Sequence, residues 1–430
     1  MTGQPAFSPW WWEGVPATPV PARDPPAEAE FAVIGAGYTG LAAALALAEA
    51  GRDVVVLEAG QPCRAASGLN GGMAGADLAH DWFALEARFG RARAAALVRE
   101  GLAALHSLEA LLARTGIDAE YRPCGRLKVA VSDAQFETLK RAAAAAAAIL
   151  EVEPEIVPRS GLADHLASPG YHGGIVWPLG GGLHPYKLAQ GLVGAAQKAG
   201  AVLVPHCPVY RIDPEAAGTG FRLLTPLGGL RARRVVVASN ARSPKSFRYM
   251  RRRQVPVGSY MIATAEIGRD AVRAAIPCGR MVVDGFHRLH YFRASPDGTR
   301  ILFGGRPQVM GEGPAACAAR LARDMRRILP ALADVDVSHA WSGMLGFALD
   351  KLPHIAEPWP GIVACGGYGG SGVAMSVHLG TRAAQRLLGR GEGATAFDEL
   401  PFPTSFLHHG LPWFLPAVMG WYALRDRTGR

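Results

Sequence analysis

The chain has 430 residues, of which 49% are hydrophobic and 19% are charged. A chain of this length normally forms two or three lobes around sizeable cores, and this composition excludes a disordered, collagen-like or coiled-coil protein. The formal net charge of +9 would suit a nucleic acid, but only six of the 45 basic residues are lysines and the arginines are scattered. We therefore expect no nucleic-acid partner, and the binding of small acidic molecules stays open.

The six cysteines lie far apart and form no C-x-x-C pair, so the sequence predicts neither a disulfide framework nor a metal site. A reducing, cytoplasmic location fits this cysteine usage best. The chain does not open with a signal-peptide pattern, and we expect no transmembrane segment. The nearest approach, residues 411–424, carries Pro412 and Pro416. We expect it to pack on the body of the protein, with contact to a membrane interface as the alternative.

The first 27 residues predict an irregular arm. Three adjacent tryptophans, Trp10 to Trp12, precede a proline-rich stretch over residues 15–26. Three tryptophans on a free arm would expose a large apolar area, so we expect them to be docked.

Residues 31–58 predict a β–α–β unit. Residues 31–34 are a short apolar β-type run, a glycine turn follows, residues 41–50 are rich in Ala and Leu, and residues 53–57 form a second apolar run. Strands without polar alternation are typical of a parallel sheet that is buried on both faces.

The turn in this unit has the pattern G-x-G-x-x-G. Gly35 would make the tight turn, Gly37 would let the backbone approach a pyrophosphate, and Gly40 would bring the helix against the strand. Glu58 ends the second strand, where its carboxylate can accept hydrogen bonds from a ribose 2′-hydroxyl and would disfavour a 2′-phosphate. The pattern predicts a dinucleotide site at the helix N-terminus, with glycines that serve packing alone as the alternative.

Further elements follow in chain order. Helices are predicted over residues 91–115, 133–150 and 185–200. Strands are predicted over residues 202–204, 209–212, 221–224, 234–238 and 361–365, and within a β-rich block from 255 to 306. The block contains a hairpin turn at residues 295–298, and a second glycine-rich turn leads into a helix from Val373.

Residues 65–72, Ala-Ala-Ser-Gly-Leu-Asn-Gly-Gly, form a loop of small residues that could line a large flat cofactor. The loop resembles the G-A-S-G-R-N-G-G segment of the flavoprotein family that includes D-amino-acid oxidase, glycine oxidase and sarcosine oxidase, in particular its γ-glutamylputrescine oxidase branch. Further blocks resemble that branch in order and spacing, and together they cover roughly residues 30–425: 174–189, VVVASN at 235–240, PVGSYMIAT at 256–264, DGFH at 284–287, YFR at 291–293, FGGR at 303–306, 341–354 and GYGGSGVA at 367–374.

The resemblance implies an α/β fold in which a Rossmann-like FAD-binding lobe is interleaved with a substrate lobe built on an antiparallel β-sheet. The FAD-binding lobe takes residues 28–115, 178–245 and 339–391. The substrate lobe takes residues 116–177 and 246–338. The remaining parts are the arm, residues 1–27, and a tail packed on the body, residues 392–430.

The resemblance also implies the residues that bind FAD. Backbone amides at Ser371 to Val373 would face the N1/C2 side of the flavin at a helix N-terminus. Residues 342–346 contain no cysteine where sarcosine oxidases attach their flavin, so the FAD is expected to be non-covalent. The expected cofactor-binding residues are Gly35, Gly37, Tyr38, Thr39, Gly40, Glu58, Ala59, Ala66, Ser67, Asn70, Gly71, Gly72, Val209, Gly343, Gly370, Ser371, Gly372 and Val373.

The implied reaction oxidises the C–N bond of an amine or amino acid. A hydride passes from the carbon that bears a neutral amine to flavin N5, the imine is hydrolysed in water, and dioxygen is the expected acceptor, giving hydrogen peroxide. The residues expected to orient the substrate are Tyr260, His287, Tyr291 and Arg293. His290 is the alternative to His287, since we expect the two to face opposite sides of a strand, and Arg306 is the alternative to Arg293 as the partner of a substrate carboxylate.

Two positions depart from the branch. Leu69 stands where the branch usually has Arg, and the segment that ends in Ser371 and Gly372 lacks the branch's histidine. The sequence therefore does not assign γ-glutamylputrescine as the substrate, nor does it predict the oligomeric state. Two alternatives stay open: a dehydrogenase that passes electrons to a quinone or another carrier, and a non-catalytic flavin-binding subunit. A pyridine-nucleotide dehydrogenase is the least favoured reading.

Overall fold

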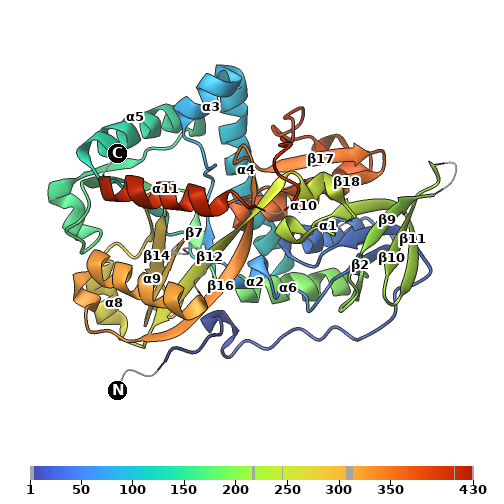
Figure 1. Ribbon diagram of the computed structural model, residues 1–430, viewed down its shortest axis with the longest axis horizontal. Helices are drawn as coiled ribbons and strands as arrows, with labels where there is room; N and C mark the ends of the chain where they lie inside the picture. Colours follow the sequence, from blue (N-terminus) through green and yellow to red (C-terminus); the bar gives the residue numbers. More distant parts are fainter. Residues whose placement is uncertain (1–3, 216–217, 245, 307–312, 411, 429–430) are drawn as a thin grey trace.

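Two eight-stranded sheets form the centre of the computed structural model, which describes residues 4–215, 218–244, 246–306, 313–410 and 412–428 (Figure 1). The first sheet runs β17-β18-β11-β1-β2-β8, and β10 and β9 continue from β11. Its strands are β1 (Glu28–Ile34), β2 (Val54–Leu57), β8 (Val202–Val204), β9 (Arg211–Pro214), β10 (Phe221–Thr225), β11 (Gly228–Val237), β17 (His354–Trp359) and β18 (Ile362–Gly366).

The β–α–β unit begins this sheet as the sequence predicts. Strands β1 and β2 pair in parallel, with Phe31 opposite Val54 and Ile34 opposite Leu57. Helix α1 (Tyr38–Glu49) connects them and packs against α10 (Gly372–Leu387) and α6 (Pro185–Lys198). Val54 and Val56 are buried in the core cluster that contains these helices, whereas Val55 and Leu57 are buried in a second cluster with Leu223 and Phe247, so β2 is apolar and buried along its whole length.

The second sheet runs β16-β12-β15-β14-β13-β4-β6-β5. Its pairs are antiparallel except β13 with β4. Its strands are β4 (Arg126–Val129), β5 (Glu155–Pro158), β6 (Gly173–Trp177), β12 (Gln254–Thr264), β13 (Met281–Asp284), β14 (His290–Ala294), β15 (Ile301–Gly305) and β16 (Val337–Ala348). Helix α9 (Pro314–Ile328) packs on this sheet and buries Leu321 and Met325. The two sheets confirm the predicted fold class.

The remaining elements surround the two sheets. Strands β3 (Met73–Ala74) and β7 (Gly181–Gly182) form a two-stranded sheet. The other α-helices are α2 (Ala66–Leu69), α3 (Trp82–Phe89), α4 (Arg91–Thr115), α5 (Asp133–Leu150), α7 (Arg248–Arg251), α8 (Arg269–Ala275) and α11 (Leu415–Thr428), and the 3-10 turns are η1 (Trp10–Trp12), η2 (Arg159–Asp164), η4 (Asn240–Arg242), η5 (Pro330–Leu332) and η6 (Gly391–Gly393).

Most predicted elements agree with the structure. Helices α4 and α5 have the predicted bounds, and the predicted hairpin is the antiparallel pair β14–β15. β11 begins at Gly228, ahead of the predicted residue 234, because its polar first half pairs with β10. The division into lobes stays a prediction. Residues 339–348, which it gives to the FAD-binding lobe, lie in β16 and pair with β12 of the second sheet.

The two ends of the chain differ in how they pack. In the arm, Trp11 is fully buried, and Trp10 and Trp12 pack against the same core. In the tail, Phe397 and His408 are buried, but no residue of α11 whose burial the structure describes is buried. None of the described helices combines the length and hydropathy that a bilayer span requires.

Candidate functional site

A cavity of about 760 Å³ opens where β1 and β2 end and where α1 and α10 begin. Ile34 and Leu57, the last residues of the two strands, line it, as do Gly372 and Val373 at the start of α10. Ligands of open α/β sheets bind outside the carboxyl ends of the strands. Three segments distant in sequence therefore meet at the place where a nucleotide is expected.

The three glycines of the turn have separate structural roles. Gly35 has φ of +101° and its N–H donates to the carbonyl of Leu57 at 2.9 Å. Gly37 is the N-cap of α1, and a Cβ on it would lie 2.9 Å from Ser67 Oγ. A Cβ on Gly40 would overlap the carbonyl oxygen of Gly35. Gly35 and Gly37 line the cavity, whereas Gly40 packs helix against strand behind it.

The carboxylate of Glu58 is fixed at the cavity wall beside Ala59. Oε2 accepts a hydrogen bond from the Ala36 N–H at 2.7 Å, and Oε1 accepts one from the Gly60 N–H at 2.9 Å. Each carboxylate oxygen keeps a lone pair for a further donor. Glu58 is thus placed to accept hydrogen bonds from ribose hydroxyls.

The small-residue loop expected over residues 65–72 forms the next wall, and its first half is the short helix α2 and not a loop. Ser67 Oγ accepts from the Tyr38 N–H at 3.0 Å, and Asn70 Nδ2 donates to the carbonyl of Ser67 at 2.9 Å. Ala66, Ser67 and Asn70 line the cavity together with Tyr38. Asn70, the C-cap of α2, therefore holds the carbonyls of Ala66 and Ser67, and the segment presents small side chains and its own polar groups to the cavity.

Gly71 and Gly72 lie outside the cavity lining and act through packing. A Cβ on Gly71 would lie 3.0 Å from the ring of Tyr291, and one on Gly72, with φ of +63°, would overlap the carbonyl of Leu183. The loop can approach these neighbours because both positions lack a side chain.

The third wall is the segment that leads into α10. Gly370, Gly372 and Val373 line the cavity, as does Thr39, whose Oγ1 lies 2.8 Å from the hydroxyl of Tyr368. Burial raises the pKa of Tyr368, so this hydroxyl stays protonated. Ser371 differs from the expectation, because its N–H donates to the carbonyl of Tyr368 at 3.0 Å within a tight turn. Val209 and Gly343 complete the expected lining.

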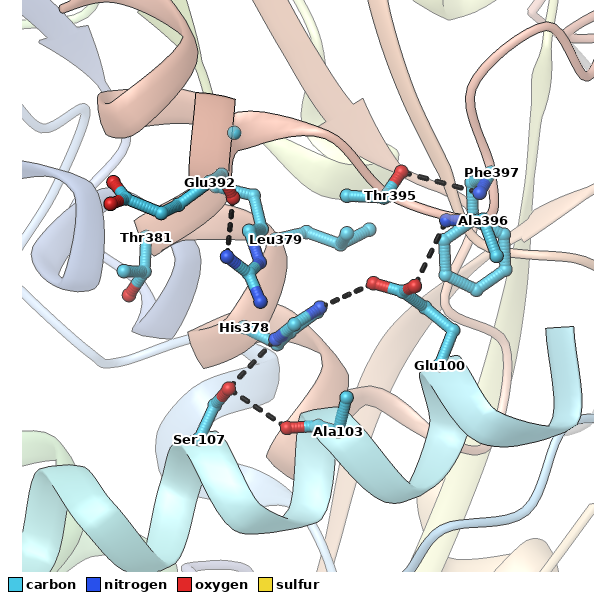
Figure 2. Close-up of polar contacts among 12 residues, drawn as sticks. Glu100, Ala103, Ser107, His378, Leu379, Thr381, Glu392, Thr395, Ala396 and Phe397 are labelled. Carbon is cyan, nitrogen blue, oxygen red and sulfur yellow. Dashed lines mark hydrogen bonds and ion pairs between the residues drawn. The ribbon is translucent and has the colours of Figure 1, made fainter. Parts of the chain in front are cut away.

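Helix α10 is fixed from behind by a buried polar network (Figure 2). His378 Nδ1 lies 2.8 Å from Ser107 Oγ of α4, and His378 Nε2 lies 2.7 Å from Glu100 Oε1. The other oxygen of Glu100 accepts from the Ala396 N–H of the tail at 2.9 Å. Burial alone would raise the pKa of Glu100, but the hydrogen bonds from His378 and Ala396 lower it. The network ties α10 to α4 and to the tail.

Tyr260 is the one expected substrate residue that lines the cavity. Burial, together with Cys317, raises its pKa to about 12. Tyr291 stands behind Gly71, with its hydroxyl 2.9 Å from Ser259 Oγ, and burial raises its pKa. Both phenols are neutral hydrogen-bonding groups near neutral pH.

Arg293 and the two histidines lie outside the cavity lining. The Arg293 guanidinium donates from Nη1 to the carbonyls of Gly72 and Leu183 and from Nε to that of Ala294, so these donors are bound to the backbone. Burial lowers its pKa to about 10. His287 lies in the turn before β14, with its ring 5.5 Å from that of Tyr422, and His290 is buried on β14 against Asp284. His287 is therefore not on a strand, contrary to the expectation.

Arg306, directly after β15, does not line the cavity either, but it lies beside the lining residue Gly370 and has the features of an anion-binding group. Its guanidinium lies 4.9 Å above the ring of Phe347, and Nη2 lies 3.7 Å from the position of a Cβ on Gly370. Its Nε is buried, and no hydrogen-bond partner for that atom is found within the described part of the chain. Burial lowers its pKa.

Sequence reasoning missed several lining residues. Residues 239–244 follow β11, the neighbour of β1, and line the cavity, as do Gln61 and Arg64 beside the small-residue loop. The pairing of β11 with β1 brings residues 239–244 to this edge. That pairing joins segments about 200 residues apart, which explains why local patterns did not reveal it.

Comparison with known proteins decides the family. The family model named DAO, FAD dependent oxidoreductase, matches residues 30–386. The chain belongs to this family. It is 32% identical to the probable oxidoreductase OrdL of Rhizobium meliloti (strain 1021), covering 99% of this chain and all of that protein. It is 30% identical to the gamma-glutamylputrescine oxidoreductase of Escherichia coli (strain K12), covering 93% of each chain. The structure of glycine oxidase from Geobacillus kaustophilus superposes with a TM-score of 0.72 at 22% identity, covering 89% of this chain and 99% of that one.

The cavity of this FAD-dependent protein fits its cofactor. The N-terminus of α1, with Gly37 as its cap, lies at the cavity where its dipole would favour a pyrophosphate, and Glu58 stands where a ribose is expected. The residues that line the cavity include neither cysteine nor histidine, the side chains that commonly attach a flavin covalently. This lining agrees with FAD held by non-covalent contacts.

Proposed function

We propose that the protein oxidises the C–N bond of an amine or amino acid, with dioxygen as the electron acceptor and hydrogen peroxide as the product. The relatives support the donor class, because one is a gamma-glutamylputrescine oxidoreductase at 30% identity and the glycine oxidase structure shares the fold. The observation that carries the proposal is the pairing of the FAD cavity with Arg306, a cation at its edge beside Gly370.

FAD held in this cavity would supply the redox chemistry, the uptake of a hydride from the carbon that bears the amine and the return of two electrons to the acceptor. The protein's own residues bind and orient the donor. The neutral hydroxyl of Tyr260 lies at the cavity wall and can hydrogen-bond an uncharged amine. A phenol with a pKa of about 12 is a poor general base at neutral pH, so this residue orients the substrate.

Arg306 would bind a carboxylate of the substrate. A planar guanidinium makes two parallel hydrogen bonds to a carboxylate, and a half-buried position strengthens them. Arg293, the expected candidate, is less suited because its buried donors are bound to the carbonyls of Gly72 and Leu183. The proposed site therefore favours amino acids or amines that carry a carboxylate.

An anaerobic reduction screen tests this function. The purified holoenzyme is mixed with simple amines, polyamine conjugates and amino acids in the absence of oxygen, and the flavin absorbance is followed. Bleaching by a carboxylate-bearing amine, followed on aeration by one hydrogen peroxide per carbonyl product, is the expected result. Bleaching without peroxide, together with turnover on a quinone, would replace the oxidase by a dehydrogenase. An FAD-loaded protein that no donor reduces would be a non-catalytic flavin-binding subunit.

We also propose that the protein acts in the cytoplasm. Its six cysteines are unpaired, as expected in a reducing compartment. Cell fractionation with an antibody against the chain would test this location.

A further inference from the structure

The N-terminal arm connects the second sheet to the FAD-binding side of the molecule. It begins beside β16, where the Ala6 N–H donates to Ser338 and the Ala340 N–H donates back to Ala6, each at 2.9 Å. It then passes through η1 and runs along one side of the molecule to β1 (Figure 1). Thr18 fixes its far end, donating from its N–H to Gln190 Oε1 at 2.6 Å and from its hydroxyl to the Gln190 carbonyl at 3.0 Å.

Trp11 lies at the centre of the arm and is fully buried. Its ring centroid lies 5.0 Å from that of His184 and 6.4 Å from that of Trp341, and the Arg293 guanidinium lies 5.8 Å above it. Trp341 and Arg293 in turn hold the small-residue loop of the cavity. Trp341 Nε1 donates to the Leu69 carbonyl at 2.9 Å, and Arg293 donates to the Gly72 carbonyl. Trp11 therefore packs against both Trp341 and Arg293, two side chains from outside the loop that hydrogen-bond to its backbone.

Trp12 contacts the cavity through a different residue. The Arg64 guanidinium lies 4.0 Å from the centre of the Trp12 ring and 5.3 Å from that of Tyr186. Arg64 lines the cavity, and the N–H of its neighbour Cys63 donates to the carbonyl of Ala36, in the glycine turn before α1, at 3.1 Å. No ion pair or hydrogen bond joins its guanidinium to another residue in the described ranges. Two aromatic faces thus hold an exposed cation beside the expected pyrophosphate.

We propose that the arm is a strap that retains FAD, with Trp11 and Trp12 as positioning residues and Arg64 as the cation that binds the cofactor's pyrophosphate. Trp11 keeps the loop from Ala66 to Gly72 in place through Trp341 and Arg293. Trp12 limits the rotamers of Arg64, so less conformational entropy is lost when a phosphate binds. This inference rests on FAD binding and is independent of the substrate and of the electron acceptor.

FAD release from the holoenzyme tests the strap. The holoenzyme is diluted and the recovery of flavin fluorescence gives the release rate. Trp11→Ala and Trp12→Ala are expected to raise the release rate at least about tenfold, and Trp12→Phe, which keeps an aromatic face, is expected to restore most of the lost retention. Trp413→Ala, which removes an exposed tryptophan of the tail, is the matched control and should release FAD like the parent protein.

The role of Arg64 is tested separately, by the affinity for FAD and by competition with ADP and adenosine. Arg64→Ala is expected to weaken FAD binding to deflavinated protein about tenfold at low salt, and the difference should shrink as ionic strength rises. ADP, which carries the pyrophosphate, should compete less well for the Arg64→Ala protein, whereas adenosine should compete equally for both. Arg52→Ala, at an exposed arginine paired with Glu30, is the control for loss of a charge.

Three results would overturn the proposal or one of its parts. Unchanged FAD release in both tryptophan variants would show that the arm does not retain the cofactor. A faster release that occurs only at temperatures where far-UV circular dichroism shows general unfolding would reduce Trp11 to a core residue. If Arg64→Ala weakened ADP and adenosine equally, Arg64 would not bind the pyrophosphate. None of these measurements uses an amine donor, so they stand even if no donor reduces the flavin.

Discussion

His290 Nδ1 lies 2.7 Å from Asp284 Oδ2, with both side chains buried in the second sheet. The other ring nitrogen, Nε2, lies 3.4 Å from Asp324 Oδ2. Burial alone would lower the pKa of His290, but the two carboxylates raise it to about 9. The imidazole between two carboxylates ties β14 to β13 and α9, and His290 does not line the cavity, which favours a structural role for it.

The pair predicts a loss of stability at alkaline pH. The folded-state pKa of His290 is about 9, above the ordinary value of 6.5. Its contribution to the unfolding free energy is therefore complete below pH 6.5 and is lost as the pH rises through 9. The thermal midpoint of the parent protein should fall over this interval, and that of His290→Gln should start lower and fall less. His106→Gln, on the exposed side of α4, should behave like the parent. An equal fall of the thermal midpoint with pH in the parent, His290→Gln and His106→Gln would contradict the prediction.

Much of the cofactor side was predictable because its signals are local. The spacing of Gly35 and Gly37 predicts a tight turn, and the apolar residues on either side predict buried strands. A short stretch of sequence was therefore enough to predict this part of the cavity wall. Glu58 could be placed because it follows directly on β2, whose end fixes its position.

The substrate side was less predictable because its contacts are long-range. Besides the adjacent Ala294 carbonyl, the Arg293 guanidinium donates to the carbonyls of Gly72 and Leu183, which are 221 and 110 residues away, and no local pattern around residue 293 predicts them. His287 precedes β14 by a turn, so an alternation rule for strands did not apply to it. The sequence also did not predict that Trp11 contacts Arg293, which holds the cavity loop, although the apolar area of the tryptophan cluster predicted that it would be docked.

Gly40→Ala should damage both stability and FAD retention. A methyl group at this position would overlap the carbonyl of Gly35, so α1 must move away from β1 and its N-terminus must leave its place at the cavity. Overpacking of this kind costs about 1–3 kcal/mol, and the purified variant should have a lower thermal midpoint and less bound FAD per chain. Gly170→Ala is the matched control, since a Cβ there meets nothing within 4 Å. A Gly40→Ala protein with full FAD content and an unchanged midpoint would refute this account.

Glu58→Ala should weaken FAD binding without unfolding the chain. The variant loses the carboxylate that would accept hydrogen bonds from the ribose, and a hydrogen bond to a charged group contributes about 1.5–3 kcal/mol. Deflavinated Glu58→Ala should therefore bind FAD at least about tenfold more weakly in a fluorescence titration. Glu30→Ala removes a partly exposed carboxylate of β1 that is paired with Arg52, and this variant should bind FAD like the parent. If both variants bound equally tightly, Glu58 would not contact the cofactor.

Arg306→Gln should separate donors by their charge. If Arg306 binds the substrate carboxylate, its loss removes a charge-assisted interaction of about 1.5–3 kcal/mol, and the KM for amino-acid donors should rise at least about tenfold. Amines without a carboxylate should be oxidised as by the parent enzyme, and Arg306→Lys should recover only part of the loss because an ammonium cannot form the paired hydrogen bonds. Arg293→Gln should act differently, because the Arg293 guanidinium binds the carbonyls of Gly72 and Leu183. This variant should contain less FAD, and its activity should fall equally with every substrate. An Arg306→Gln enzyme that lost activity equally with carboxylate-bearing and plain amines would show that this arginine does not select the substrate, whatever its effect on rate.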